Sequence, residues 1–184
     1  MKVQVVIGIL LLVSFLNREH LFSPSHHQPR SYPASLSLRI KGFILTYNKQ
    51  LPEREAEEMA NLIILYSQRA RLDPCLLTAL IARESRFNPQ AVSSSGALGL
   101  GQLMPGTAKE VGVEDPFDSE QNIRGTADYL RKMFDAWEGY SNQLDLALAS
   151  YRLGCGTVRN YGGIPPILDV KDYIKSVKEL AKRI

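Results

Sequence analysis

The stretch DPCLLTALIARES, residues 73–85, decides how this chain of 184 residues folds. Asp73 followed by Pro74 is the combination of N-cap and first-turn proline that begins a helix. The residues after Pro74 are apolar on most sides of a helix. This pattern predicts a buried helix at the centre of the domain.

Glu84 lies near the end of this helix and raises the main question about function. Leu77, Leu80 and Ile81 precede it by seven, four and three residues, so they share its helix face. Burial against such an apolar face disfavours the charged carboxylate and raises its pKa, as a general acid near neutral pH requires. A solvated carboxylate at a helix end is the alternative, and the position of Glu84 alone leaves both open.

The rest of the chain from residue 51 onward predicts helices and no alternating strands, hence an all-α domain of six or so short helices. Hydrophobic spacing indicates helices over residues 53–71, 120–137, 144–153 and 170–183. Between the central helix and the next lies a long irregular loop, residues 88–108, with a short helix near its end. Loops of this length inside a compact domain are usually functional.

Three local features refine this outline. Asp118 and Gln121 form a D-x-x-Q capping box for the helix that follows them. Glycines flank Cys155 and stop the helix 144–153. Residues 36–48 lack clear periodicity, and either a short strand or a packed N-terminal helix fits them.

The first 50 residues differ from the remainder. Residues 1–22 contain a run of 14 mostly apolar residues after Met1-Lys2, which predicts a signal peptide or an uncleaved signal anchor; a buried strand or helix is the alternative. Residues 23–50, rich in Ser, Pro and His at their start, read as a linker or N-terminal extension. We therefore expect an exported protein of the periplasm or cell envelope, possible membrane anchoring by the leader, and a single domain over residues 51–184.

The charge distribution argues against nucleic acid as a partner. Residues 1–52 carry six Lys/Arg against one acid, whereas residues 53–184 carry 16 Lys/Arg against 18 acids. The folded part therefore lacks the basic surface that phosphate backbones require.

No metal or cofactor is expected. Cys75 and Cys155 belong to no CxxC motif or cysteine/histidine cluster, so a zinc site has no ligand set. In an exported protein the two could form one disulfide, but their sequence separation does not decide it.

Four ordered blocks between about residues 55 and 180 resemble one family. The blocks are ARESRFNPQAVSSSGALGLGQLMPGTA, DPFDSEQNIRGTADYL, ALASYRLGCG and DVKDYIKSV. They are similar to the catalytic domain of the lytic transglycosylases of the soluble-transglycosylase type, which have a lysozyme-like fold and cleave the glycan strands of bacterial peptidoglycan. The resemblance implies that fold and implies peptidoglycan glycan strands as the partner. It leaves the oligomeric state open.

The resemblance also assigns roles to individual residues. It implies that Glu84 is the sole catalytic acid/base. Supporting or substrate-binding roles are implied for the residues that match the family's cleft, namely Ser85, Gln102, Met104, Asn122, Tyr151 and Tyr173. Amides and hydroxyls suit sugar hydroxyl and N-acetyl groups. Taken singly, Gln102 and Asn122 could instead cap backbone groups, and the tyrosines could be core residues.

The sequence departs from the family pattern at several positions. Gly101 stands where the family usually carries a methionine, which we expect to remove a side chain from the cleft wall. Arg152 replaces an amide. Its side chain either alters which saccharide ring is preferred or points outward. Asp169 stands where a glutamate is usual.

Glycoside hydrolysis normally needs two carboxylates, and no second acid stands out. Asp115 and Asp118 have turn and capping duties, and Glu120 lies in a first helical turn where acids are favoured. The resemblance implies instead that Glu84 transfers both protons while the muramoyl C6 hydroxyl attacks C1, giving a 1,6-anhydro product. A hydrolytic muramidase and a non-catalytic protein that binds cell-wall glycan are the alternatives.

Overall fold

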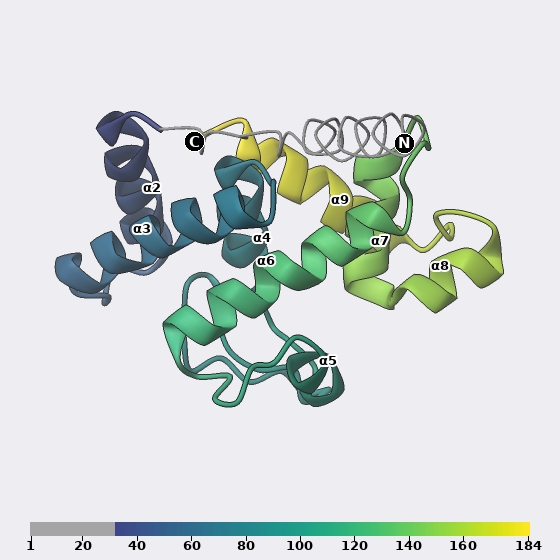
Figure 1. Cartoon of the computed structure of the whole chain (residues 1–184), viewed down its shortest axis with the longest axis horizontal. Helices are drawn as coiled ribbons and strands as arrows, with labels where there is room; N and C mark the ends of the chain where they lie inside the picture. The colour runs from purple at the N-terminus through teal and green to yellow at the C-terminus, as the bar shows by residue number, and fades with distance from the viewer. Residues whose placement is uncertain (1–31) are drawn as a thin grey trace, which may run out of the picture. The chain divides into compact units, whose positions relative to one another are not determined.

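The computed structural model describes residues 32–184, and within them the chain forms eight α-helices (Figure 1). They are α2 (Ala34–Tyr47), α3 (Glu53–Arg69), α4 (Pro74–Ser85), α5 (Pro105–Glu110), α6 (Ser119–Asp135), α7 (Gln143–Leu153), α8 (Cys155–Tyr161) and α9 (Leu168–Ala181). This part of the chain contains no strand, only isolated bridges that join Leu98 to Val92 and Leu103. The predicted all-α class is confirmed. The expected leader, residues 1–22, lies outside the described residues.

The segment that the sequence left undecided, residues 36–48, is helical. On α2, Leu36, Ile40, Phe43 and Ile44 are buried and belong to the main hydrophobic core. The helix packs against α3 and α4. The packed unit therefore begins well before residue 51, because the apolar face of α2 completes the core rather than forming a linker.

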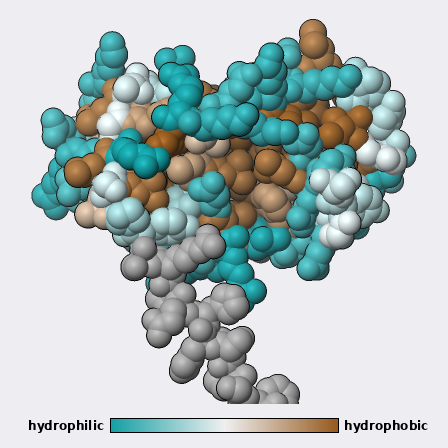
Figure 2. All heavy atoms as spheres, turned by 90° about the horizontal axis from the view of Figure 1, so that it is seen from above, coloured by the Kyte–Doolittle hydropathy of each residue, from teal (hydrophilic) through white to brown (hydrophobic). Residues whose placement is uncertain are grey.

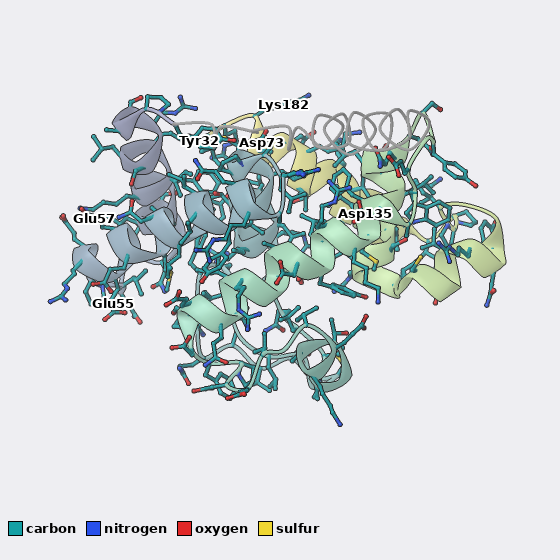
Figure 3. All side chains as sticks on the ribbon, in the orientation of Figure 1. Tyr32, Glu55, Glu57, Asp73, Asp135 and Lys182 are labelled. Atoms are coloured by element: carbon teal, nitrogen blue, oxygen red, sulfur yellow. The ribbon has the colours of Figure 1, made fainter. Side chains whose placement is uncertain are left out.

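The central helix α4 follows its predicted pattern. The side chain of Asp73 accepts a hydrogen bond of 2.8 Å from the backbone N–H of Cys75, so it caps the helix (Figure 3). Leu77, Leu80 and Ile81 have no exposed surface. The face of α4 that ends at Glu84 therefore lies inside the core.

The start of α6 confirms half of the predicted capping box. The side chain of Asp118 accepts from the backbone N–H of Gln121 at 2.8 Å. The Gln121 side chain does not bind Asp118 in return; its oxygen accepts from the backbone N–H groups of Glu114 and Asp115. Gln121 thus fixes the turn before the helix, because that turn brings two backbone donors within its reach.

The predicted end of the helix 144–153 is confirmed, because α7 stops at Leu153. Gly154 interrupts the helix at a φ of 82°, but a new helix, α8, begins at once at Cys155. A single residue with positive φ is enough to change the chain direction, so Gly154 separates two helices. Neither Cys75 nor Cys155 forms a disulfide.

The last helix, α9, carries residues from the end of the chain to the centre of the fold. It packs against α4 and α7 (Figure 1). Its buried side chains, Val170, Tyr173, Ile174 and Val177, lie on one face. This packing brings Tyr173 to the end of α4.

The surface is mixed rather than uniformly polar. In Figure 2, apolar side chains occupy the middle of one face and hydrophilic side chains surround them. Charged residues such as Glu55 and Glu57 project from α3 on different sides, and Glu57 reaches Lys41 of α2 (Figure 3). Among the described residues, none of the helices combines the length and apolarity needed to cross a membrane.

Candidate active site

The end of α4 is built to present Glu84. Arg86 and Phe87 follow the helix with φ of 54° and 59°, left-handed values that are uncommon for residues other than glycine. The Phe87 ring is fully buried and meets the ring of Phe43 on α2 edge-on, at 6.3 Å between centroids. Asn48, just after α2, donates to the Phe87 carbonyl at 3.0 Å. The helix α2 therefore fixes the tight turn that ends α4 at Glu84.

Glu84 forms a short hydrogen bond with a residue from the other end of the domain. The Tyr173 hydroxyl donates to Oε1 of Glu84 at 2.6 Å. Burial raises the pKa of the Glu84 carboxyl above its ordinary value, although the Tyr173 hydrogen bond and the charges of Arg152 and Arg83 lower it. A carboxyl with a raised pKa keeps its proton at a pH where an ordinary glutamate has lost it, which suits a general acid.

Two tyrosines stand near this carboxyl as hydrogen-bond donors. Burial, followed by the negative charge of Glu84, raises the pKa of Tyr173 well above its usual value. The same two causes raise the pKa of Tyr151. The Tyr151 hydroxyl donates to the carbonyl of Gly101 at 2.8 Å. Both hydroxyls therefore stay protonated; one binds the carboxyl and the other holds the loop beside it.

The loop between α4 and α5 is attached to α6 through Asn122. The Asn122 side chain is fully buried and accepts from the N–H of Gly101 at 2.8 Å. Its amide nitrogen donates to the carbonyls of Leu98 and Pro116, at 3.2 and 2.7 Å. With no exposed surface, Asn122 organises the loop backbone, which agrees with the capping alternative.

Two glycines let this loop approach α6 closely. A Cβ atom on Gly99 would lie 2.1 Å from the Pro116 carbonyl oxygen, and Gly99 has a φ of 71°. A Cβ atom on Gly101 would lie 1.9 Å from Oγ1 of Thr126. The expectation that Gly101 removes a side chain from the cleft wall is therefore wrong, because that position faces α6 in the interior.

The remaining predicted residues lie around the loop and the helix end. Gln102, at a φ of 51°, donates from its amide to the carbonyls of Ala91 and Gly99. Ser85 is half-buried and its hydroxyl donates to the Ile81 carbonyl at 3.3 Å. Met104 is 45% exposed at the start of α5. Met104 and Ser85 are accessible, whereas the Gln102 amide supports the loop.

A cluster of charges covers the outer side of Tyr173. The guanidinium carbons of Arg83 and Arg152 lie 5.6 and 5.7 Å from the centre of the Tyr173 ring. Arg152 also donates from Nε and Nη2 to Oδ2 of Asp169, at 3.3 and 3.2 Å. The negative charge of Asp169 raises the pKa of Glu84, opposing the two arginines. The sequence departures at positions 152 and 169 thus lie together beside Glu84.

The three acids considered as a second carboxylate have other partners. Asp115 accepts from the N–H of Phe117, and Asp118 caps α6. Glu120 accepts a hydrogen bond of 2.6 Å from the Tyr66 hydroxyl. Asp169 is instead the acid whose charge acts on Glu84. Within residues 32–184, no three His, Cys, Asp or Glu side chains gather as a metal site would require.

The structure thus brings Glu84, Tyr173 and Tyr151 together and shows neighbours that the sequence did not reveal. Two of these neighbours had no sequence signal. Thr126 leaves no room for a side chain at position 101, and Asn48 holds the turn after α4. Asp169 had such a signal, because it departs from the family pattern within the same block as Tyr173.

Comparison with known proteins matches this arrangement to one family. The transglycosylase SLT domain family matches residues 61–174. A membrane-bound lytic murein transglycosylase F of Photobacterium profundum is 41% identical over 120 residues, which are 63% of this chain and 22% of that protein. A transglycosylase of Enterobacteria phage PRD1 is 41% identical over 88 residues, covering 48% of this chain and 32% of that protein.

Solved structures of lytic transglycosylases are also similar to this chain. An inactive mutant of the lytic transglycosylase Slt of Pseudomonas aeruginosa has a TM-score of 0.60 and 27% identity, covering 66% of this chain and 23% of that one. The 70-kDa soluble lytic transglycosylase of Escherichia coli has a TM-score of 0.63 and 20% identity, over 80% of this chain and 29% of that one, and shows the fold alone. The chain thus spans about a fifth to a third of the length of these relatives.

Proposed function

Because the chain belongs to the transglycosylase SLT domain family, we propose that it is a peptidoglycan lytic transglycosylase with Glu84 as its single acid/base. It cleaves the β-1,4 bond between N-acetylmuramic acid and N-acetylglucosamine and leaves a 1,6-anhydromuramoyl end. The observation that carries this proposal is the half-buried Glu84 carboxyl, with its raised pKa, bound to Tyr173 at 2.6 Å. Peptidoglycan glycan strands are its substrate.

The first proton transfer uses the protonated form of Glu84. Tyr173 donates to Oε1, so the acidic proton resides on the other oxygen, Oε2, and passes to the glycosidic oxygen. The bond from C1 of the muramoyl residue to that oxygen then breaks, and N-acetylglucosamine leaves with its hydroxyl restored. Positive charge develops at C1, as in other glycoside cleavage reactions.

The second transfer returns the proton to Glu84. The C6 hydroxyl of the same muramoyl residue attacks C1, and the ionised Glu84 carboxylate takes the hydroxyl proton. A bond forms between O6 and C1, so the product is an anhydro sugar and no water is consumed. Glu84 ends protonated, ready for the next cycle, while Tyr173 holds the same oxygen in both charge states.

A single-carboxylate reaction also agrees with the positions of the other acids. Asp115, Asp118 and Glu120 have the turn, cap and tyrosine partners described above. Asp169 is paired with Arg152, which leaves it poorly suited to activate a water molecule. The substrate's own hydroxyl replaces the missing nucleophile.

The chain acts at the cell envelope. The apolar leader, residues 1–22, exports it and either is removed or anchors it to the membrane. The relatives described as membrane-bound lytic murein transglycosylases support this location.

Mass spectrometry of digested sacculi tests the function. We expect anhydromuramoyl ends from the wild type and none from Glu84→Gln, which keeps an acceptor for Tyr173 but has no acidic proton. Glu138→Gln, at an exposed position after α6, is the matched control and retains activity. Reducing ends without anhydro products would indicate a muramidase instead, and binding of glycan by the wild type without cleavage would indicate a non-catalytic protein.

A further inference from the structure

Two arginine side chains at the candidate active site have a role that proton transfer does not explain. Arg83, next to Glu84 on α4, and Arg152, at the end of α7, both place a guanidinium within 6 Å of the centre of the Tyr173 ring. Tyr173 is 1% exposed, whereas both arginines are exposed. The arginines therefore form the solvent-facing cover over the residue that binds the catalytic carboxyl.

The charges of these side chains are not fully balanced. Arg152 binds a single oxygen of Asp169 through Nε and Nη2, which leaves the N–H groups of Nη1 available. Arg83 forms no ion pair within 4.0 Å among residues 32–184. The charged groups that act on Glu84 are these two arginines and one acid, Asp169. Glu84 itself is protonated in the state that binds substrate.

The positive charges of the two arginines also oppose the proposed protonation of Glu84. Both arginine charges lower the pKa of Glu84, which works against its use as an acid. An interaction that offsets these charges would help the half-buried Glu84 keep its proton. An anion on the substrate would supply it, because a bound carboxylate would neutralise the arginine charge near Glu84.

The glycan strand offers such an anion near the cleaved bond. Each muramoyl residue carries a lactyl ether that ends either in a free carboxylate or in a stem peptide with its own carboxylates. Arginine binds carboxylates through a planar fork of N–H donors, which an amide side chain cannot reproduce. An amide is the residue type that the family pattern has at position 152.

We propose that Arg152, assisted by Arg83, binds a carboxylate on the muramoyl residue at the cleaved bond, so that this chain prefers anionic glycan strands. This inference rests on the proposed function. Asp169 holds the Arg152 guanidinium against the Tyr173 ring, which fixes the orientation of the remaining N–H groups. Arg152 is thus a specificity-determining residue, distinct from the proton transfer by Glu84.

The test compares three forms of the same short glycan strands. The first form carries intact stem peptides. The second is treated with an amidase so that each lactyl group ends in a free carboxylate. In the third, that carboxylate is converted to a neutral methylamide. The full chain cleaves each form at several concentrations, and anhydro ends are counted to obtain kcat and KM.

We expect Arg152→Asn to lower kcat/KM on carboxylate-bearing strands by about tenfold, mainly through KM, and to leave the KM of the neutral strands unchanged. Its effect on the pKa of Glu84 acts through kcat and is common to all three forms. Arg152→Lys recovers part of the loss because it keeps the charge, and Arg83→Gln has a smaller effect in the same direction. Arg54→Gln, which removes an exposed arginine paired with Glu58 on α3, is the control and changes none of the three.

The comparison of the first two forms identifies the source of the anion. A loss confined to peptide-bearing strands assigns the carboxylate to the stem peptide, and an equal loss on amidase-treated strands assigns it to the lactyl group. A loss of the same size on the neutral strands, or none on any, overturns the inference and leaves the proposed function standing. Failure of the wild type to cleave any of the three overturns the proposed function, and this inference falls with it.

Discussion

The hydroxyl of Tyr173 lies 2.6 Å from Oε1 of Glu84, although 89 residues separate them in the chain. This contact joins the end of α4 to the middle of α9, so correct packing of the last helix determines the position of the proposed acid. It also selects one carboxyl oxygen as acceptor and leaves the other for a substrate. The contact therefore influences both the pKa and the orientation of Glu84.

Replacing Tyr173 with phenylalanine tests both effects. The hydrogen bond from Tyr173 lowers the pKa of Glu84, so its loss raises that pKa further. In the proposed mechanism activity requires protonated Glu84 and falls as the pH rises through its pKa, so the alkaline limb of the kcat profile shifts to higher pH. We expect kcat at the optimum to fall about tenfold, since the carboxyl is no longer oriented. Tyr140→Phe, at an exposed tyrosine, leaves the profile unchanged, and an alkaline limb that moves to lower pH would contradict the assignment.

Stability should depend on the charge of Glu84. Its pKa is raised in the folded protein, so folding favours the protonated form, and stability is lost as the pH rises through that pKa. Glu84→Gln has no charge to bury, and we expect its Tm to exceed that of the wild type at pH 7. The difference shrinks at a pH below 4.5, the ordinary value for glutamate, where both side chains are neutral.

Thermal unfolding followed by circular dichroism at pH 7 and pH 3.5 provides this comparison. Glu138→Gln, an exposed glutamate, serves as the control and has the wild-type Tm at both values. A Tm for Glu84→Gln below that of the wild type at pH 7 would show that ionised Glu84 stabilises the fold.

Asp169 provides the sharpest test of a hydrolytic mechanism. Its charge raises the pKa of Glu84, so Asp169→Asn lowers that pKa and shifts the alkaline limb to lower pH, opposite to Tyr173→Phe. We expect kcat/KM at the optimum to change by less than about tenfold. If Asp169 were a second catalytic carboxylate, its loss would cost about 10²–10⁴-fold. Measurement of anhydro and reducing ends over a pH series distinguishes these outcomes.

The sequence predicted those features that depend on local pattern. The apolar face of Leu77, Leu80 and Ile81 below Glu84 follows from helical spacing, and all three are fully buried. The Asp73 cap follows from residue type. The second helix after Gly154 was missed because glycine signals a break in direction but does not specify the structure of the next segment.

Other parts depend on tertiary contacts that spacing does not reveal. The sequence left open whether Asn122 faces a sugar or caps backbone; its complete burial and three backbone partners support capping. The role of α2 was equally hidden, because its weak periodicity gives no sign that Asn48 and Phe43 hold the turn after α4. Burial and long-range partners decide these roles.

The close approach of Gly101 to Thr126 predicts a coupled stability defect. A Cβ atom at position 101 would lie 1.9, 2.8 and 2.9 Å from Oγ1, Cγ2 and Cβ of Thr126, so Gly101→Ala forces the loop away from α6. We expect a loss of about 1–3 kcal/mol in the free energy of unfolding in urea, as for other overpacked interiors. Thr126→Ala removes the two closest atoms and leaves the third, so the double variant recovers part of that loss, giving a favourable coupling energy. Gly106→Ala, where an added Cβ meets no atom within 4 Å, is the matched control. Strict additivity of the two substitutions would show that the loop is not seated on Thr126.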